Sequence, residues 1–268
     1  MIFPRLFLCF CMFSLALCNE QFDSHLLPRP LIVEYGENVI RTSRVREWDD
    51  GVQLHCDSWR FAVEANNLNP WKMIPRECAE YVREYIMGRG YQFDLERVSN
   101  EAGVYAKSVE LGEDGKDVWV FDIDETLLSN LPYYAGHGYG LEIFNSVEFD
   151  NWVEKGAAPA IDSSLKLYKE ILSLGFKVIL LTGRGEEQRG VTEENLVNAG
   201  FQNWDKLILR GSEDRGKRAV TYKSEKRSEM LTQGYRIHGN SGDQWSDLLG
   251  FSLSNRSFKL PNPMYYIP

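Results

Sequence analysis

Residues 118–126 read VWVFDIDET, a short apolar run followed at once by two aspartates, Asp122 and Asp124. An apolar run of β-prone residues is typical of a strand that is covered on both faces. Two carboxylates close together at the end of such a strand are unfavourable, because like charges raise one pKa or require a cation. This stretch therefore predicts a buried strand that ends in a chemically unusual pair of acids.

The chain around this stretch alternates between expected strands and expected helices. Further strands are expected at residues 177–181, 207–209 and 236–238, and helices at residues 164–174 and 191–198. Strands that alternate with helices favour an α/β fold with a mostly parallel sheet. In such sheets ligands bind beyond the carboxyl ends of the strands, so the residues directly after each strand are the candidates for function.

The acid pair after the first strand suits phosphoryl transfer. Asp122 would attack phosphorus and form an aspartyl-phosphate. Asp124 would protonate the leaving oxygen and then activate water. Thr126 could donate a hydrogen bond nearby. An isolated Asp-x-Asp pattern is more often a surface turn, so the residues after the other strands have to decide between the two interpretations.

Two later stretches place phosphate-binding groups near other expected strands. Thr182, Gly183 and Arg184 follow the second strand. Their hydroxyl and guanidinium groups can donate to phosphate, and the glycine allows a close approach of the backbone. Lys223 precedes the fourth strand and could hold both a carboxylate and phosphoryl oxygens. Spacing alone does not separate it from the neighbouring cations at positions 226 and 227.

Asp243 and Asp247 follow the fourth strand in a Gly-containing stretch. Their spacing of four would place them on one face of a helical turn. Oxygen ligands without nearby Cys or His suit a hard cation, and Mg²⁺ is the usual ion of phosphoryl transfer. If these acids join the earlier pair, the candidate lysine and arginine leave two negative charges unbalanced, and one Mg²⁺ would cancel them.

Four motifs in this order, DIDET, LLTGR, YKSEKR and GDQWSD, resemble those of the haloacid dehalogenase-like superfamily. The wider chain resembles the plant acid phosphatase and vegetative storage protein family, of the class B acid phosphatase type. Its supporting stretches are CDSWRFAVEANNLNPW, VWVFDIDETLLSNLPYY and the ending KLPNPMYYIP, and the likeness covers nearly the whole mature chain.

The resemblance implies a Rossmann-like core, flanked by helices, with a defined set of site residues. Asp122 would be the nucleophile and Asp124 the acid/base. Phosphate would be bound by Thr182, Gly183, Arg184 and Lys223. The metal group would comprise Asp122, Asp124 through its carbonyl, Asp243 and, as an assisting residue, Asp247.

The resemblance also implies a function. Some storage members of that family lack the first aspartate, whereas this sequence keeps both Asp122 and Asp124. We therefore expect an acid phosphatase that hydrolyses phosphate monoesters with Mg²⁺ through an aspartyl-phosphate. The alternatives are a vegetative storage protein with weak or vestigial phosphatase activity, and a binding module without catalysis on the same scaffold.

Three regions are expected along the chain. Residues 1–18 read as a signal peptide, and residues 19–111 as a helical N-terminal extension with helices near 75–88 and 94–109. Residues 112–268 would form the phosphatase core, with a small, aromatic-rich cap at about 130–160. That cap could shape the approach to the site, although core packing accounts for aromatic residues equally well.

The first residues and the cysteines indicate the secretory pathway. One arginine precedes an apolar run of 12 residues, which fits a cleaved signal and is short for a membrane span of about 20 residues. Cleavage leaves Cys56 and Cys78, which predict a disulfide in an oxidising compartment. Asn255 opens an Asn-Arg-Ser sequon and predicts glycosylation. The mature chain would be extracellular or vacuolar, without membrane contact.

Composition limits the partners. The 268 residues are 43% hydrophobic and 26% charged, as in an ordinary globular protein. The net charge of -9 argues against binding to nucleic acid or to an anionic membrane, because both require a basic face. A small phosphate monoester needs only a few local cations and remains the expected substrate. The sequence leaves open whether the chain forms a homodimer.

Overall fold

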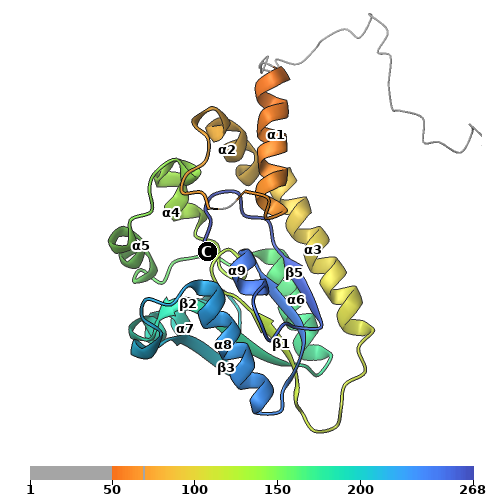
Figure 1. The fold of residues 1–268 in the computed structure, drawn as a ribbon. Helices are drawn as coiled ribbons and strands as arrows, with labels where there is room; N and C mark the ends of the chain where they lie inside the picture. Colours follow the sequence, from red (N-terminus) through yellow and green to blue (C-terminus); the bar gives the residue numbers. More distant parts are fainter. Residues whose placement is uncertain (1–49, 69) are drawn as a thin grey trace, which may run out of the picture. The chain divides into compact units, whose positions relative to one another are not determined.

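The computed structural model describes residues 50–68 and 70–268, and its centre is one parallel sheet (Figure 1). The predicted signal peptide at residues 1–18 lies outside the described residues. The strand order is β3-β2-β1-β4-β5, and every neighbouring pair is parallel. The predicted α/β fold is therefore confirmed. The strands are β1 (Asp117–Phe121), β2 (Lys177–Gly185), β3 (Lys206–Arg210), β4 (Arg236–Gly242) and β5 (Arg256–Lys259).

Helices precede the sheet and connect its strands. The α-helices are α1 (Asp50–Glu64), α2 (Ala79–Met87), α3 (Arg89–Lys107), α4 (Leu131–Gly136), α5 (Ser146–Val153), α6 (Asp162–Ser173), α7 (Arg189–Asn198), α8 (Ala219–Thr232) and α9 (Trp245–Leu248). Short 3₁₀ helices are η1 (Arg76–Cys78), η2 (Gly138–Gly140), η3 (Glu186–Gln188) and η4 (Ser212–Asp214). The expected helical N-terminal region is thus present from residue 50 onward.

The central strand β1 is buried on both faces, as its apolar run predicts. Trp119 and Phe121 pack with α3 and α6 on one face, and Val118 and Val120 pack with α8 on the other. Each such side chain contributes about 1.5–3 kcal/mol through burial. Gly239 of β4 lies against the Trp119 ring, where an added Cβ would come within 2.4 Å of ring carbons. Only glycine leaves room for this tryptophan.

Two differences from the expected elements have simple causes. Helix α1 was not expected, because its buried residues Cys56, Trp59 and Val63 alternate with exposed apolar ones such as Phe61. That exposed group obscures the helical period in the sequence. Strand β2 also extends past its apolar run to Gly185, since Gly185 still pairs with Arg210 of β3.

A small helical insertion lies between β1 and α6, and it contains α4, η2 and α5. Its two ends are joined, because Ser129 N donates to Pro159 O at 2.9 Å and Ile161 N donates to Leu127 O at 2.8 Å. The chain therefore leaves the core and returns at one place. This arrangement agrees with the expected cap insertion of the fold.

The N-terminal helices are tied together covalently. Cys56 of α1 and Cys78 of η1 form the predicted disulfide, with a sequence separation of 22 residues. A loop of this length contributes about 3 kcal/mol by loss of unfolded-chain entropy. Among the described residues, none of the helices has the length and hydropathy needed to cross a bilayer.

Candidate active site

A cavity of about 560 Å³ opens where the carboxyl ends of the strands meet the insertion and the C-terminal residues. The strands place the residues directly after β1 and β4 and the last residues of β2 at one edge of the sheet, and α8 adds the side chain of Lys223 from its second turn. Most of the residues predicted for the site line this cavity: Asp122, Asp124, Gly183, Arg184, Lys223, Asp243 and Asp247. Residues separated widely in the sequence therefore meet in one place.

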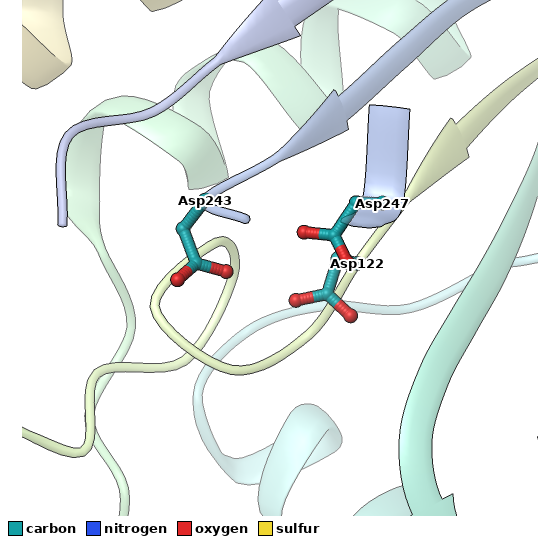
Figure 2. Close-up of side chains that lie close together, drawn as sticks. All are labelled: Asp122, Asp243 and Asp247. Carbon is teal, nitrogen blue, oxygen red and sulfur yellow. The ribbon is translucent and has the colours of Figure 1, made fainter. Parts of the chain in front are cut away.

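Three carboxylates gather beside β1 and β4. Figure 2 shows Asp122 directly after β1, Asp243 directly after β4 and Asp247 on α9. One carboxylate oxygen of each lies within 4.8 Å of those of the other two. The three residues are 6%, 1% and 4% exposed, so water screens the repulsion between their charges only weakly. This is the close approach of buried acids that the sequence predicted.

The electrostatics of this cluster suit a divalent cation. Burial raises the pKa of Asp122 well above its ordinary value and Asp247 adds to the rise, although Lys223 opposes it. Burial and the like charge of Asp247 raise the pKa of Asp243 to about 7. A hard cation with oxygen ligands would relieve both effects, since it favours the charged carboxylates. The donor set therefore fits Mg²⁺.

Lys223 lies between two of these acids. Its Nζ donates to Asp122 Oδ1 and to Asp247 Oδ1, both at 2.5 Å. Burial lowers the pKa of Lys223, but the two carboxylates raise it above its ordinary value, so the ammonium stays charged. The other two cations of the stretch lie elsewhere, because Lys226 pairs with acidic side chains and Arg227 donates to backbone carbonyls. Tertiary structure thus selects Lys223.

Asp124 has a different environment from Asp122. The Arg184 guanidinium donates from one nitrogen to Asp124 Oδ1 at 2.7 Å and from Nε to Oδ2 at 3.1 Å. Asn130 Nδ2 donates to Oδ1 at 2.8 Å. Burial alone would raise the pKa of Asp124, but Arg184 outweighs it and holds the pKa below the usual value. Arg184 thus orients the acid, and its predicted contact with phosphate stays a prediction.

The two predicted threonines, Thr126 and Thr182, are buried beside residues of the cavity lining, to which Gly183 belongs. Thr126 Oγ1 lies 3.4 Å from Asp122 Oδ2. Thr182 is fully buried, and its Oγ1 accepts a hydrogen bond from Arg184 N at 3.1 Å. Gly183 has open space where a side chain would lie, so its backbone is accessible from the cavity. The last residues of β2 therefore present a backbone edge beside the acids.

Sequence reasoning missed a second layer of this site. Glu125 is fully buried and accepts hydrogen bonds from Asn130 N at 2.6 Å and Tyr265 Oη at 2.5 Å. Burial and the charge of Asp124 raise the pKa of Glu125 to about 7. The position of Glu125 within DIDET was a usable signal, whereas nothing local marks Tyr265 as part of the site.

The fold and this cluster define a phosphatase-type member of the haloacid dehalogenase class. Its marks are a central parallel strand that ends in two aspartates, a buried lysine beside the first, and further acids after a neighbouring strand. The model of the HAD superfamily, subfamily IIIB (Acid phosphatase), matches residues 41–268. The chain belongs to this family.

Individual proteins agree with that assignment. Acid phosphatase 1 of Solanum lycopersicum is 63% identical over 98% of this chain and 99% of its own length. Vegetative storage protein 2 of Arabidopsis thaliana is 41% identical over 80% of this chain and 81% of its own. The class C acid phosphatase of Bacillus anthracis has the same fold, with a TM-score of 0.58 and 24% identity over 70% of this chain and 85% of that one.

Proposed function

We propose that this protein is an acid phosphatase that hydrolyses small phosphate monoesters through Asp122 and Asp124. The observation that carries the proposal is the convergence of Asp122, Lys223, Asp243 and Asp247 beside Asp124 in one cavity. A protein that only stored nitrogen would not need to bury so many like charges, because such burial is costly without a ligand.

The two aspartates would divide the reaction between them. A carboxylate oxygen of Asp122 forms a bond to phosphorus while the bond from phosphorus to the leaving oxygen breaks. Asp124 gives its proton to that oxygen, and the alcohol leaves. Asp124 then takes a proton from water, whose oxygen attacks phosphorus and releases phosphate from Asp122. Arg184 holds the pKa of Asp124 below its ordinary value and so disfavours the protonated form that the first step needs, whereas acidic solution favours that form.

The proposed metal site uses the carboxylates beside the nucleophile. Asp122, Asp243 and the backbone carbonyl of Asp124 would hold Mg²⁺, with Asp247 supporting the site. The bound ion would neutralise negative charge on the phosphoryl group. Lys223 opposes the rise in the pKa of Asp122 and holds its carboxylate in place, and a bound cation would favour the ionised nucleophile. Residues 182–184, at the end of β2, would bind phosphoryl oxygens.

Storage is the second candidate function. The identity of 41% to a vegetative storage protein supports it, because the relatives of this chain include storage proteins as well as acid phosphatases. A storage protein with vestigial activity would retain the fold and lose the need for turnover. The complete acid set favours catalysis.

We further propose a mature, glycosylated form in the secretory pathway, extracellular or vacuolar. The Cys56–Cys78 disulfide supports an oxidising compartment. Asn255 is exposed and directly precedes β5, so a glycan there would meet no packed core. We also propose that residues 1–18 are cleaved and that the mature protein has no nucleic-acid or membrane partner. The sequence leaves open whether the protein forms a homodimer.

A phosphate-release assay tests the proposed function. We expect the wild type to hydrolyse p-nitrophenyl phosphate with Mg²⁺ and to lose activity in EDTA. Asp122→Asn should remain folded and lose turnover by about 10³-fold or more, because the nucleophile is gone. Asp162→Asn, an exposed acid outside the cavity, is the matched control and should keep full activity. A folded wild type without phosphate release would favour storage.

A further inference from the structure

The C-terminal segment, residues 260–268, is built into the active site. Tyr265, Tyr266 and Ile267 line the cavity. The segment starts beside β4, where Leu260 N donates to Gly242 O at 2.9 Å, and it ends at α8, where Ala219 N donates to Pro268 O at 3.1 Å. It therefore joins the strand that delivers Asp243 to the helix that carries Lys223.

Asn262 is the polar side chain by which this segment reaches the acid cluster. The residue is 2% exposed, and its Nδ2 donates to Asp243 Oδ2 at 2.7 Å. Its Oδ1 accepts from Met264 N at 2.9 Å. Since a backbone N–H can only donate, this second bond determines which end of the amide faces the carboxylate. Asn262 therefore presents a fixed donor to Asp243.

The contact occupies one side of the Asp243 carboxylate. Gln244 Nε2 also donates to Asp243 Oδ2, at 2.7 Å. Within residues 50–68 and 70–268, the structure shows no hydrogen bond to Asp243 Oδ1. Two amides thus hold the carboxylate by one oxygen and leave the other available to a cation. Such partners restrict rotation of a ligating carboxylate and raise its affinity for metal.

Asn262 is itself held rigidly by distant elements. Its backbone N donates to Glu64 Oε1 of α1 at 2.9 Å, and Lys259 Nζ donates to the other oxygen of Glu64 at 2.8 Å. The insertion presses on the same segment, because a Cβ added to Gly140 would lie 2.1 Å from Met264 O. Contacts from both sides keep the amide from following Asp243 if the carboxylate turns.

We propose that Asn262 is a positioning residue that orients Asp243 for Mg²⁺, so that the C-terminal segment determines metal affinity. This inference rests on the metal site of the proposed function. Asn262 does not contact the substrate or the reacting atoms in this scheme. Its effect passes through Asp243, and it should appear as a change in metal binding that excess Mg²⁺ overcomes.

Calorimetric titration of the purified protein with Mg²⁺ tests the proposal directly. We expect Asn262→Ala to raise the dissociation constant for Mg²⁺ by about 10- to 100-fold. Asn262→Leu, which fills similar space without a donor, should do the same and guards against an effect of the cavity alone. At saturating Mg²⁺ both variants should recover the KM of wild type and most of its kcat.

Leu260→Ala is the matched control. Leu260 is also 2% exposed in the same segment, and its side chain packs in the apolar cluster of the N-terminal helices. This variant should lower the melting temperature yet keep the Mg²⁺ affinity of wild type. Unchanged affinity in folded Asn262 variants, or an equal loss in Leu260→Ala, would overturn the role of Asn262. A wild type that binds no Mg²⁺ would overturn the proposed metal site as well.

Discussion

Asp122 and Asp124 are two residues apart and have opposite electrostatic environments. Burial and neighbouring acids raise the pKa of Asp122, whereas Arg184 and Asn130 keep the pKa of Asp124 low despite burial. Environments that push the pKa values of two neighbouring carboxyl groups apart are typical of acid/base pairs with separate roles. Taken alone, these shifts favour a protonated Asp122 and an ionised Asp124, the reverse of the proposed nucleophile and acid. The proposed roles therefore require a cation beside Asp122, which would favour its ionised form.

The role of Asp124 can be tested through the leaving group. Asp124→Asn cannot donate a proton, so esters with basic leaving oxygens should suffer most. We expect kcat/KM for an alkyl phosphate to fall by about 10²- to 10⁴-fold, with a much smaller loss for p-nitrophenyl phosphate, whose phenolate leaves without help. Steady-state kinetics on both esters measures this. Equal losses for the two would show that Asp124 acts otherwise.

The elements around β1 separate chemistry from stability. The carboxyl end of β1 delivers the two aspartates to the cavity. Its amino end holds Asp117, which is 3% exposed and accepts from Arg236 Nε at 2.7 Å and lies 2.6 Å from His238 Nε2. Both partners belong to β4, so this cluster locks the register of the two central strands. We expect it to affect unfolding without affecting catalysis.

The ion pair of Asp117 gives stability a defined pH dependence. Hydrogen bonds from Arg236, with a smaller contribution from His238, outweigh burial and hold the pKa of Asp117 well below its usual range. Because the pKa of Asp117 is lower in the folded state than in the unfolded state, its ion pair stabilises the protein at pH values above the unfolded-state pKa of about 3.9. This stabilisation is lost as the pH falls through the folded-state pKa. Asp117→Asn should therefore melt lower than wild type at pH 6.

The difference between these melting temperatures should shrink progressively below about pH 4, where the unfolded chain becomes protonated. Thermal unfolding followed by circular dichroism from pH 3 to 7 measures it. Asp162→Asn serves as the control, because that acid is exposed and lies away from the strands. If the difference in melting temperature between wild type and Asp117→Asn stays constant down to pH 3, the ion pair of Asp117 is not the source of this pH dependence.

The N-terminal helices and the sheet share interior contacts over the described residues. Ala102 and Ala106 of α3 lie in the same apolar cluster as the core strands. Glu64 of α1 bonds to Asn262, and its carbonyl accepts from Trp245 Nε1 at 3.0 Å. The boundary expected near residue 111 therefore crosses many interactions. Parts connected in this way should unfold together.

Scanning calorimetry of the mature protein tests this cooperativity. We expect a single transition for the folded region, with calorimetric and van't Hoff enthalpies that agree, because neither the helical part nor the sheet has a complete core alone. Phosphatase activity should disappear over the same temperature range. Two separate transitions, only one of which removes activity, would show instead that the N-terminal helices form an independent unit.

Much of the fold could be inferred from local patterns. The apolar runs of β1 and β2, the helical period of α6 and the acids after β1 are all encoded within a few residues. The edge strand β5 escaped prediction, since only Phe258 of its four residues is buried. Local pattern fails for β5 because a four-residue strand with one buried side chain contains no apolar run, whereas the other edge strand, β3, has such a run at residues 207–209 and was expected.

Local sequence therefore determined the parallel sheet, the acid pair at 122 and 124, and the disulfide partners, because each depends on short-range periodicity or on a small choice of residues. Tertiary structure alone decided which cation faces the nucleophile, that Arg184 holds Asp124, and that Asn262 holds Asp243. These contacts join atoms brought together by the packing of elements far apart in the chain. The physical reason is that a side chain's partner depends on the direction and distance set by the whole fold, which no local spacing specifies.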